Sequence, residues 1–150
     1  MVIAVDFDGT VVEHEYPKIG KAIPFAIDTL LQLQKEGHTL IMWTVRDGEL
    51  LDEAVEYCAR KGLRFYAANK NYPEEDVISA SRKLNADLFI DDRNLGGLPD
   101  WGVIYRIVKT MEEGDYFSFE SIMASNEYGN RSQKKKNFLI RLGEMFEKGY

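Results

Sequence analysis

The chain has 150 residues, 45% of them hydrophobic and 29% charged, which suits one globular domain with a substantial core. Its formal net charge of −6 argues against a broad electrostatic grip on nucleic acid, because phosphate backbones are held mainly by Lys and Arg. Cys58 is the single cysteine, which excludes an intramolecular disulfide. The first residues lack a charged secretory leader, and no apolar run approaches the roughly 20 residues that span a bilayer. We therefore expect a soluble, cytoplasmic protein without a membrane partner.

The first half of the chain alternates strand and helix patterns. Residues 2–5 are an apolar run typical of a buried strand. The next apolar residues recur at helical spacing: Ile23, Ile27, Leu30 and Leu31. Pro24 suits the first turn of this helix and Gly37 its C-terminal stop. The short apolar run 39–45, which contains β-branched and aromatic residues, predicts the second strand.

The second half continues the alternation before it loosens. Asp47 can cap a helix that ends at Gly62. The elements expected next are a strand at 64–67, a brief helix beginning at 72–75, a strand at 86–90 and a helix at 103–111. A polar linker at 126–133 then leads to an amphipathic helix over 138–146. We divide the chain into a catalytic core, 1–112, and a C-terminal extension, 113–150.

This alternation predicts an α/β fold with a mostly parallel sheet. In such sheets ligands bind beyond the carboxyl ends of the strands. The polar residues at or just past the predicted strand ends are Asp6, Asp8, Thr44, Asp91 and Asp92. We expect them to converge on one edge of the sheet, where buried carboxylates call for a cation, a proton or a reacting group.

Four motifs in a fixed order strengthen this interpretation. They are the run Asp6-Phe7-Asp8-Gly9-Thr10, then Thr44, then Lys83, then the pair Asp91-Asp92. This set resembles the signature motifs of the haloacid-dehalogenase-like (HAD) superfamily over roughly residues 1–100. The resemblance implies a three-layer, Rossmann-like core. Too few residues separate the motifs for a cap domain, so the chain is similar to a capless, small phosphatase-like group with a comparable "FIDDRN" run.

The resemblance also implies roles for the motif residues. Asp6 would be the nucleophile that forms an aspartyl phosphate, and Asp8 would transfer protons to the leaving oxygen and from the attacking water. Thr44 would donate a hydrogen bond to the phosphate, and Lys83 would neutralise a phosphate oxygen together with Asp6. Mg²⁺ would be held by side chains and, at Asp8, by the backbone carbonyl; the metal set is Asp6, Asp8, Asp91 and Asp92.

Substrate contacts are expected in the loops at the same edge. The candidates are Gly9, Thr10, Arg46, Asn69, Arg93 and Asn94. Gly9 would let the backbone turn closely around the phosphate. Arg46 could meet a second anionic part of the substrate, or form a salt bridge with Asp47 or Glu49. His14 could visit the site, although a solvated loop histidine is the better interpretation, and His38 is expected to be structural.

Structural interpretations of the same residues stay open. Taken alone, Asp91-Asp92-Arg93-Asn94 could be a strand-to-loop cap in which Arg93 neutralises one acid. Thr44 alone could be an ordinary strand residue, and Lys83 alone a solvated lysine. Only the joint order of the four motifs favours catalysis over these alternatives.

The sequence therefore predicts a Mg²⁺-dependent phosphomonoester hydrolase with an aspartyl-phosphate intermediate. Its partner would be a phosphorylated substrate, either a small molecule or a macromolecule, with nucleic acid expected only as a substrate. Because an uncapped site is open to water, a large substrate or a neighbouring subunit of a homo-oligomer could serve as the lid. The alternatives are a receiver-like phosphoacceptor and a non-catalytic phosphate-binding module.

Overall fold

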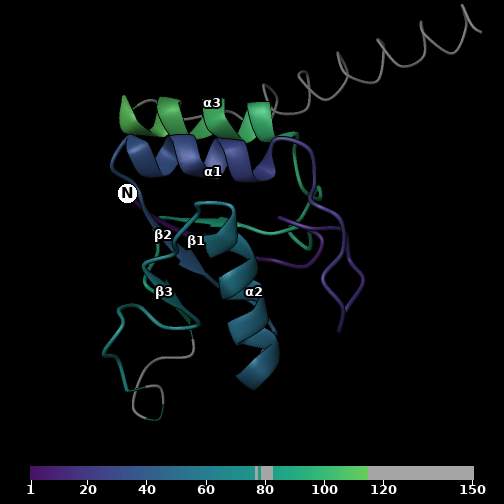
Figure 1. The fold of residues 1–150 in the computed structure, drawn as a ribbon. Helices are drawn as coiled ribbons and strands as arrows, with labels where there is room; N and C mark the ends of the chain where they lie inside the picture. Colours follow the sequence, from purple (N-terminus) through teal and green to yellow (C-terminus); the bar gives the residue numbers. More distant parts are fainter. Residues whose placement is uncertain (77, 79–82, 115–150) are drawn as a thin grey trace, which may run out of the picture. The chain divides into compact units, whose positions relative to one another are not determined.

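The computed structural model describes residues 1–76, 78 and 83–114 (Figure 1). The chain divides into two compact units, Met1–Tyr105 and Arg106–Tyr150. All residues of the candidate site lie in the first unit. The linker expected at 126–133 and the helix expected at 138–146 lie outside the described residues.

The first unit is built on a four-stranded sheet whose strand pairs are all parallel. Its strands are β1 (Val2–Val5), β2 (Thr39–Met42), β3 (Ala67–Ala68) and β4 (Leu88–Ile90), in the order β3-β2-β1-β4. With the helices between them, this sheet confirms the expected α/β, Rossmann-like fold. β1 is paired on both sides, and Ile3, Ala4 and Val5 are fully buried, as the apolar run predicted.

The strand register sorts the sheet residues onto two faces. Ala4 lies opposite Ile41 on one side and Phe89 on the other, so these three side chains share a face. Together with Ala67 and Leu84 they belong to one apolar cluster. Because residues two apart share a face, Asp6 lies on the same face as Ala4, just past the end of β1.

The helices of the first unit follow the sequence pattern with one late start. α1 (Ala26–Lys35) begins two residues after Pro24, because Phe25 at its N-cap takes a left-handed conformation with φ 65°. α2 (Gly48–Arg60) begins as predicted behind Asp47, whose Oδ1 accepts a hydrogen bond from the backbone N of Gly48 at 2.8 Å. The helix expected over 103–111 is α3 (Trp101–Glu112), in which the boundary between the two units falls.

Several predicted boundaries differ from the structure, among them the start of β4, which begins at Leu88 rather than at residue 86. β2 ends at Met42 rather than at residue 45, because the backbone N of Thr44 bonds a side chain instead of a neighbouring strand. β3 begins at Ala67, later than the predicted 64, and the carbonyl of Arg64 accepts a hydrogen bond from a side chain of α1. Residues 72–75 form a turn rather than the start of a helix, and residues 77 and 79–82 lie outside the described chain.

The segment between β1 and α1 is a narrow out-and-back loop. Its two arms meet in an antiparallel bridge between Val12 and Ala22, and the backbone N of Glu13 donates to the carbonyl of Lys21 at 2.7 Å. At Gly20 a Cβ atom would lie 2.1 Å from the carbonyl oxygen of Glu13, so only glycine fits there. Between β1 and α1 the chain therefore has no room for a cap domain, in agreement with the prediction.

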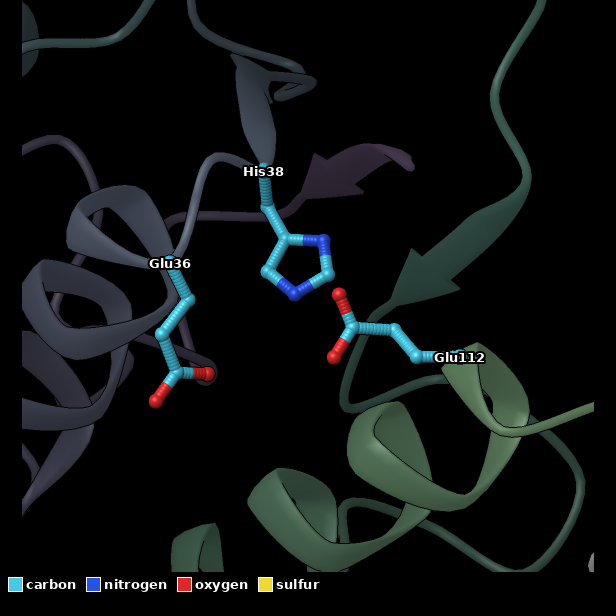
Figure 2. A group of neighbouring side chains, drawn as sticks. All are labelled: Glu36, His38 and Glu112. Atoms are coloured by element: carbon cyan, nitrogen blue, oxygen red, sulfur yellow. The ribbon is translucent and has the colours of Figure 1, made fainter.

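The junction between α1 and β2 holds the second histidine (Figure 2). His38 is buried, and its Nδ1 lies 3.4 Å from the N-terminal amine of Met1. Nearby, a carboxylate oxygen of Glu36 accepts a hydrogen bond from the hydroxyl of Tyr105 at 2.7 Å. The third residue drawn in Figure 2, Glu112, belongs to the other unit. His38 therefore lies at a helix–strand junction, away from the hollow described below.

Among residues 1–76, 78 and 83–114, none of the helices combines the length and the apolar composition required to cross a bilayer.

Candidate functional site

The carboxyl ends of the central strands carry the predicted site residues to one edge. The hydrogen-bond ladder between the strands continues just past their ends. The backbone N of Asp6 donates to the carbonyl of Ile90 at 2.9 Å, and the backbone N of Trp43 donates to the carbonyl of Val5 at 2.8 Å. A hollow of about 210 Å³ lies at this edge. Its lining residues are Asp6, Asp8, His14, Trp43, Thr44, Val45, Asp91 and Arg93.

Three carboxylates meet at this edge. Each of Asp6, Asp91 and Asp92 offers one oxygen, and these oxygens all lie within 4.8 Å of one another. Oδ1 of Asp92 is buried and has no hydrogen-bond partner in the described part of the chain. A buried acceptor without a donor is costly, and a cation would satisfy it. The group is therefore able to hold a metal ion.

Two small residues of the first motif shape this acidic group. The hydroxyl of Thr10 donates to Oδ2 of Asp6 at 3.3 Å and accepts from the backbone N of Asp92 at 3.0 Å. Gly9 has φ +91°, and a Cβ atom there would lie 2.4 Å from Oδ2 of Asp92. Thr10 is fully buried, so it joins the two acidic segments instead of meeting a substrate as expected. The close neighbour of Gly9 is the carboxylate of Asp92.

The crowding of the acids changes the titration of Asp6. The pKa of Asp6 is raised from 3.8 to about 6, chiefly by burial and also by the nearby charges of Asp91 and Asp92, while hydrogen bonds from Phe7 and Thr10 partly offset the increase. Without a cation, Asp6 therefore ionises at a higher pH than an ordinary aspartate. A metal ion at the three carboxylates would lower this pKa.

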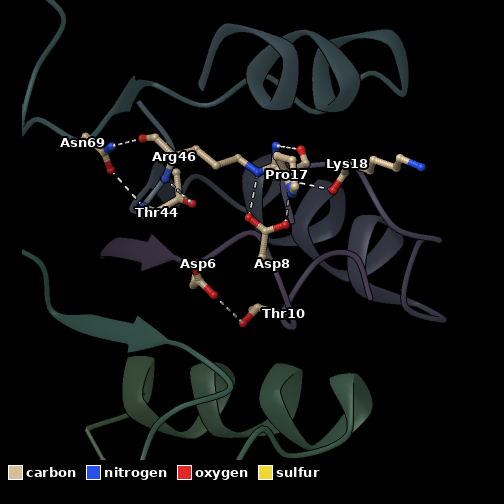
Figure 3. Close-up of polar contacts among 8 residues, drawn as sticks. All are labelled: Asp6, Asp8, Thr10, Pro17, Lys18, Thr44, Arg46 and Asn69. Carbon is tan, nitrogen blue, oxygen red and sulfur yellow. Dashed lines mark hydrogen bonds and ion pairs between the residues drawn. The ribbon is translucent and has the colours of Figure 1, made fainter. Parts of the chain in front are cut away.

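Asp8 has a different environment, although it is only two residues away. Nε of Arg46 donates to its Oδ2 and Nη2 donates to its Oδ1, both at 2.7 Å (Figure 3). Arg46 is 0% exposed, and its Nη1 and Nη2 also donate to the carbonyls of Pro17 and Lys18, each at 2.9 Å. The hydrogen bonds with Asp8 raise the pKa of Arg46. The expectation of a substrate contact or an exposed salt bridge at Arg46 is therefore corrected.

Asn69 also takes a supporting place. Its Oδ1 accepts from the backbone N of Thr44 at 2.8 Å, and its Nδ2 donates to the carbonyl of Arg46 at 3.0 Å (Figure 3). Its φ of 55° is one that asparagine tolerates better than most residues. With both ends of its amide engaged, Asn69 fixes the loop after β2 and is not presented to a substrate. Thr44, held by this loop, lines the hollow as predicted.

Lys83 is not joined to the acids. Its Nζ lies over the ring of Phe89, 5.8 Å from the centroid, and within the described chain it forms no ion pair. Phe89 shares the sheet face of Asp6, so Lys83 lies on that face but does not form the expected pairing with Asp6. The structure therefore brings Thr44 to the hollow and leaves Lys83 beside it.

The two remaining substrate candidates, Arg93 and Asn94, lie in different environments. The backbone N of Arg93 donates to Oδ1 of Asp91 at 2.8 Å, which leaves its exposed side chain to line the hollow. The side chain of Asn94 instead donates to the carbonyl of Phe89 at 3.4 Å, and its own carbonyl accepts from Gly97 at 2.8 Å. Asn94 therefore closes the loop after β4.

Sequence reasoning missed part of the hollow's wall. Trp43 and Val45 line it on either side of Thr44, and Val45 is 73% exposed. Trp43 packs edge-on against Phe89, with ring centroids 4.9 Å apart. Their positions next to a predicted strand end were the available signal. His14, expected as a solvated residue, is exposed and also lines the hollow.

Comparison with known proteins adds one relative. No family model and no curated protein matches the chain. The chain is similar to the solved structure of a conserved protein from Bacteroides thetaiotaomicron, with 65% sequence identity and a TM-score of 0.71. The match covers 78% of this chain and 93% of that chain. The chain therefore belongs to the same protein family as this conserved Bacteroides protein.

Proposed function

We propose that the protein is a Mg²⁺-dependent phosphomonoester hydrolase that works through an aspartyl phosphate on Asp6. The observation that carries the proposal is the meeting of the Asp6, Asp91 and Asp92 oxygens within 4.8 Å at the carboxyl edge of a parallel sheet. The order of the four motifs, which resembles that of the HAD superfamily, supports the same chemistry.

The donor set fits a hard divalent cation. All the available ligands are oxygens, which favours Mg²⁺ over softer metals, and the unpartnered Oδ1 of Asp92 is a ready ligand. The ion would be held by the side chains of Asp6, Asp91 and Asp92 and by the backbone carbonyl of Asp8. When bound, it would offset the repulsion between carboxylate and phosphate, about 4 kcal/mol for two unit charges about 4 Å apart at an effective dielectric of 20.

The reaction needs two displacements at phosphorus. In the first, a carboxylate oxygen of Asp6 forms a bond to phosphorus while the ester P–O bond breaks, and the leaving oxygen takes a proton from Asp8. In the second, a water oxygen attacks the same phosphorus, Asp8 takes the water proton, and the bond between phosphorus and Asp6 breaks to release inorganic phosphate. Asp8 lines the hollow together with Asp6, which suits this proton transfer.

The neighbouring polar groups would stabilise the charge that develops on the phosphate. The hydroxyl of Thr44 lines the hollow and can donate to a phosphate oxygen. Lys83 has an exposed side chain over Phe89, close to the face of Asp6, and would turn toward the phosphate when substrate binds. Arg93 and His14, both exposed at the rim, would contact the rest of the substrate.

The test is release of inorganic phosphate from an aryl phosphate and from a panel of sugar phosphates, nucleotides, oligonucleotide termini and phosphopeptides, with and without Mg²⁺. We expect Mg²⁺-dependent turnover that Asp6→Asn abolishes. Asp52→Asn, an exposed acid on α2 outside the hollow, is the matched control and should retain the wild-type rate.

Two results would overturn the proposal. Wild-type turnover in Asp6→Asn would remove the nucleophile. A stable aspartyl phosphate on Asp6 without turnover would instead favour a receiver-like phosphoacceptor.

A further inference from the structure

Arg46 is fully buried next to the hollow, and the proposed reaction assigns it no part. Its guanidinium makes two parallel 2.7 Å hydrogen bonds to the two carboxylate oxygens of Asp8. The exposed fractions of the two side chains are 0% and 3%. A bidentate pair of this kind fixes the plane of a carboxylate as well as its position, since both oxygens are tied to one rigid fork.

The same guanidinium is anchored on its other sides. It donates to the carbonyls of Pro17 and Lys18, on the loop between β1 and α1, and its central carbon lies 5.2 Å and 5.4 Å from the ring centroids of Phe7 and Tyr16. These contacts leave it little freedom to follow a substrate. Arg46 therefore ties the out-and-back loop to the first motif.

The backbone of Arg46 is held as firmly. Its N donates to the hydroxyl oxygen of Thr44 at 3.3 Å, and its carbonyl accepts from Asn69. The loop after β2 thus presents Thr44 to the hollow and sends Arg46 to Asp8 from positions only two residues apart. The two groups expected to act on the leaving oxygen and on the phosphate share one support.

Resting on the proposed function, we propose that Arg46 is a positioning residue that holds the Asp8 carboxyl group in the orientation from which, when protonated, it gives its proton to the leaving oxygen. Each carboxylate oxygen gives one lone pair to the guanidinium, and the remaining lone pairs stay available for the proton that is transferred. The effect of Arg46 on the reaction should therefore depend on how much the leaving group needs a proton.

The experiment compares two substrates, 4-nitrophenyl phosphate and a simple alkyl phosphate, by kcat/KM. The nitrophenolate departs readily as an anion, whereas an alkoxide needs the acid. We expect Arg46→Met to lower kcat/KM for the alkyl phosphate about 10²-fold, within the usual range for general acid catalysis, and that for the aryl phosphate less than tenfold. Arg46→Lys, which keeps the charge but not the fork, should fall between Arg46→Met and wild type.

Four further variants keep the test independent of folding. Asp8→Glu retains the acid but cannot keep both 2.7 Å contacts with Arg46. Its kcat/KM should fall more for the alkyl phosphate than for the aryl phosphate, and the same is expected of Asp8→Asn. In the Asp8→Asn background, Arg46→Lys should no longer change the ratio of the two kcat/KM values. Arg60→Met removes an exposed arginine paired with Glu56 on α2 and should leave both values unchanged.

Equal losses on the two substrates in Arg46→Lys, or a wild-type ratio in Asp8→Glu, would overturn the positioning role while leaving the phosphatase intact. A wild-type protein that releases phosphate neither from these two substrates nor from the panel described above would instead refute the proposed function itself.

Discussion

The two aspartates of the first motif lie two residues apart and have opposite surroundings. Asp8 is buried against a guanidinium that satisfies both of its oxygens. Asp6 lies among two further acids, with its pKa raised to about 6, beside an Asp92 oxygen that has no partner in the described chain. One half of the site has its charges paired as folded, and the other half is a group of acids that could hold a cation. Two positions two residues apart in the first motif therefore have different roles in the structure: Asp8 is part of the scaffold, and Asp6 belongs to the group that could bind a cation.

The largest expected effect is on the free energy of unfolding and concerns the buried pair of Asp8 and Arg46. Asp8→Ala leaves the guanidinium of Arg46 buried without its counter-charge, which typically costs about 3–5 kcal/mol. Glu56→Ala breaks the exposed ion pair with Arg60, which is worth about 1 kcal/mol or less. Urea denaturation of both variants measures the difference. Equal losses of unfolding free energy would contradict the distinction between the two pairs.

The next effect concerns the acidic group around Asp6 and is measured as the pH dependence of stability. Because the pKa of Asp6 is raised on folding, the native protein binds more protons than the unfolded chain between about pH 4 and pH 6. Its contribution to stability is therefore lost as pH rises through this window. Mg²⁺ should raise the melting temperature more at pH 7.5 than at pH 5. At one hundred times its Kd, Mg²⁺ should increase the free energy of unfolding by about 2.7 kcal/mol.

The matched variant for this experiment is Asp6→Asn. It should flatten the pH dependence of the melting temperature in the metal-free protein and remove most of the response to Mg²⁺. An unchanged response would place the cation elsewhere. Calorimetric titration of Mg²⁺ into both proteins provides the independent measurement.

A smaller effect separates backbone strain from crowding. Gly9→Ala forces a left-handed conformation on alanine and places a Cβ atom against the carboxylate of Asp92. Gly37→Ala imposes the same strain at φ +89° with open space around it. Both should lose about 1–2 kcal/mol from strain, but only Gly9→Ala should also weaken Mg²⁺ binding. Equal Mg²⁺ affinities would show that Asp92 is not a ligand.

The smallest effect concerns the link between the acids. Thr10→Val removes the hydroxyl that bonds both Asp6 and the backbone of Asp92, which should cost about 1–2 kcal/mol because the N–H of Asp92 loses its acceptor. Since the Thr10 hydrogen bond lowers the pKa of Asp6, the variant should titrate this group at higher pH. Carbonyl-resolved NMR titration of Asp6 would detect the change. A pKa that stays the same would argue against the bond.

The sequence was sufficient for the sheet and for the edge where the acids meet. Apolar runs ending in Asp6 and in Asp91 predicted two strands of a parallel sheet, whose carboxyl ends share an edge, and the structure shows these two strands to be neighbours. The partner of Arg46 could not be predicted, because the pairing with Asp8 spans 38 positions and depends on how two loops close over each other. Local pattern favoured the neighbours Asp47 and Glu49 instead.

The same limit explains the other differences. The helix expected at 72–75 rested on a proline and two acids, a signal that also fits the turn found there. The place of Lys83 depends on the path of the chain between β3 and β4, which residue spacing does not fix. Asn69 was correctly placed near the site, but its two-sided amide contacts follow from tertiary closure.

The position of β1 at the interior of the sheet has a practical consequence. Asp6 is attached to a strand that is zipped to a neighbour along each side, so its backbone is among the last parts of the fold that local fluctuations can move. Engineering the outward surfaces of α1 and α2, for immobilisation or labelling, should therefore leave the position of Asp6 undisturbed.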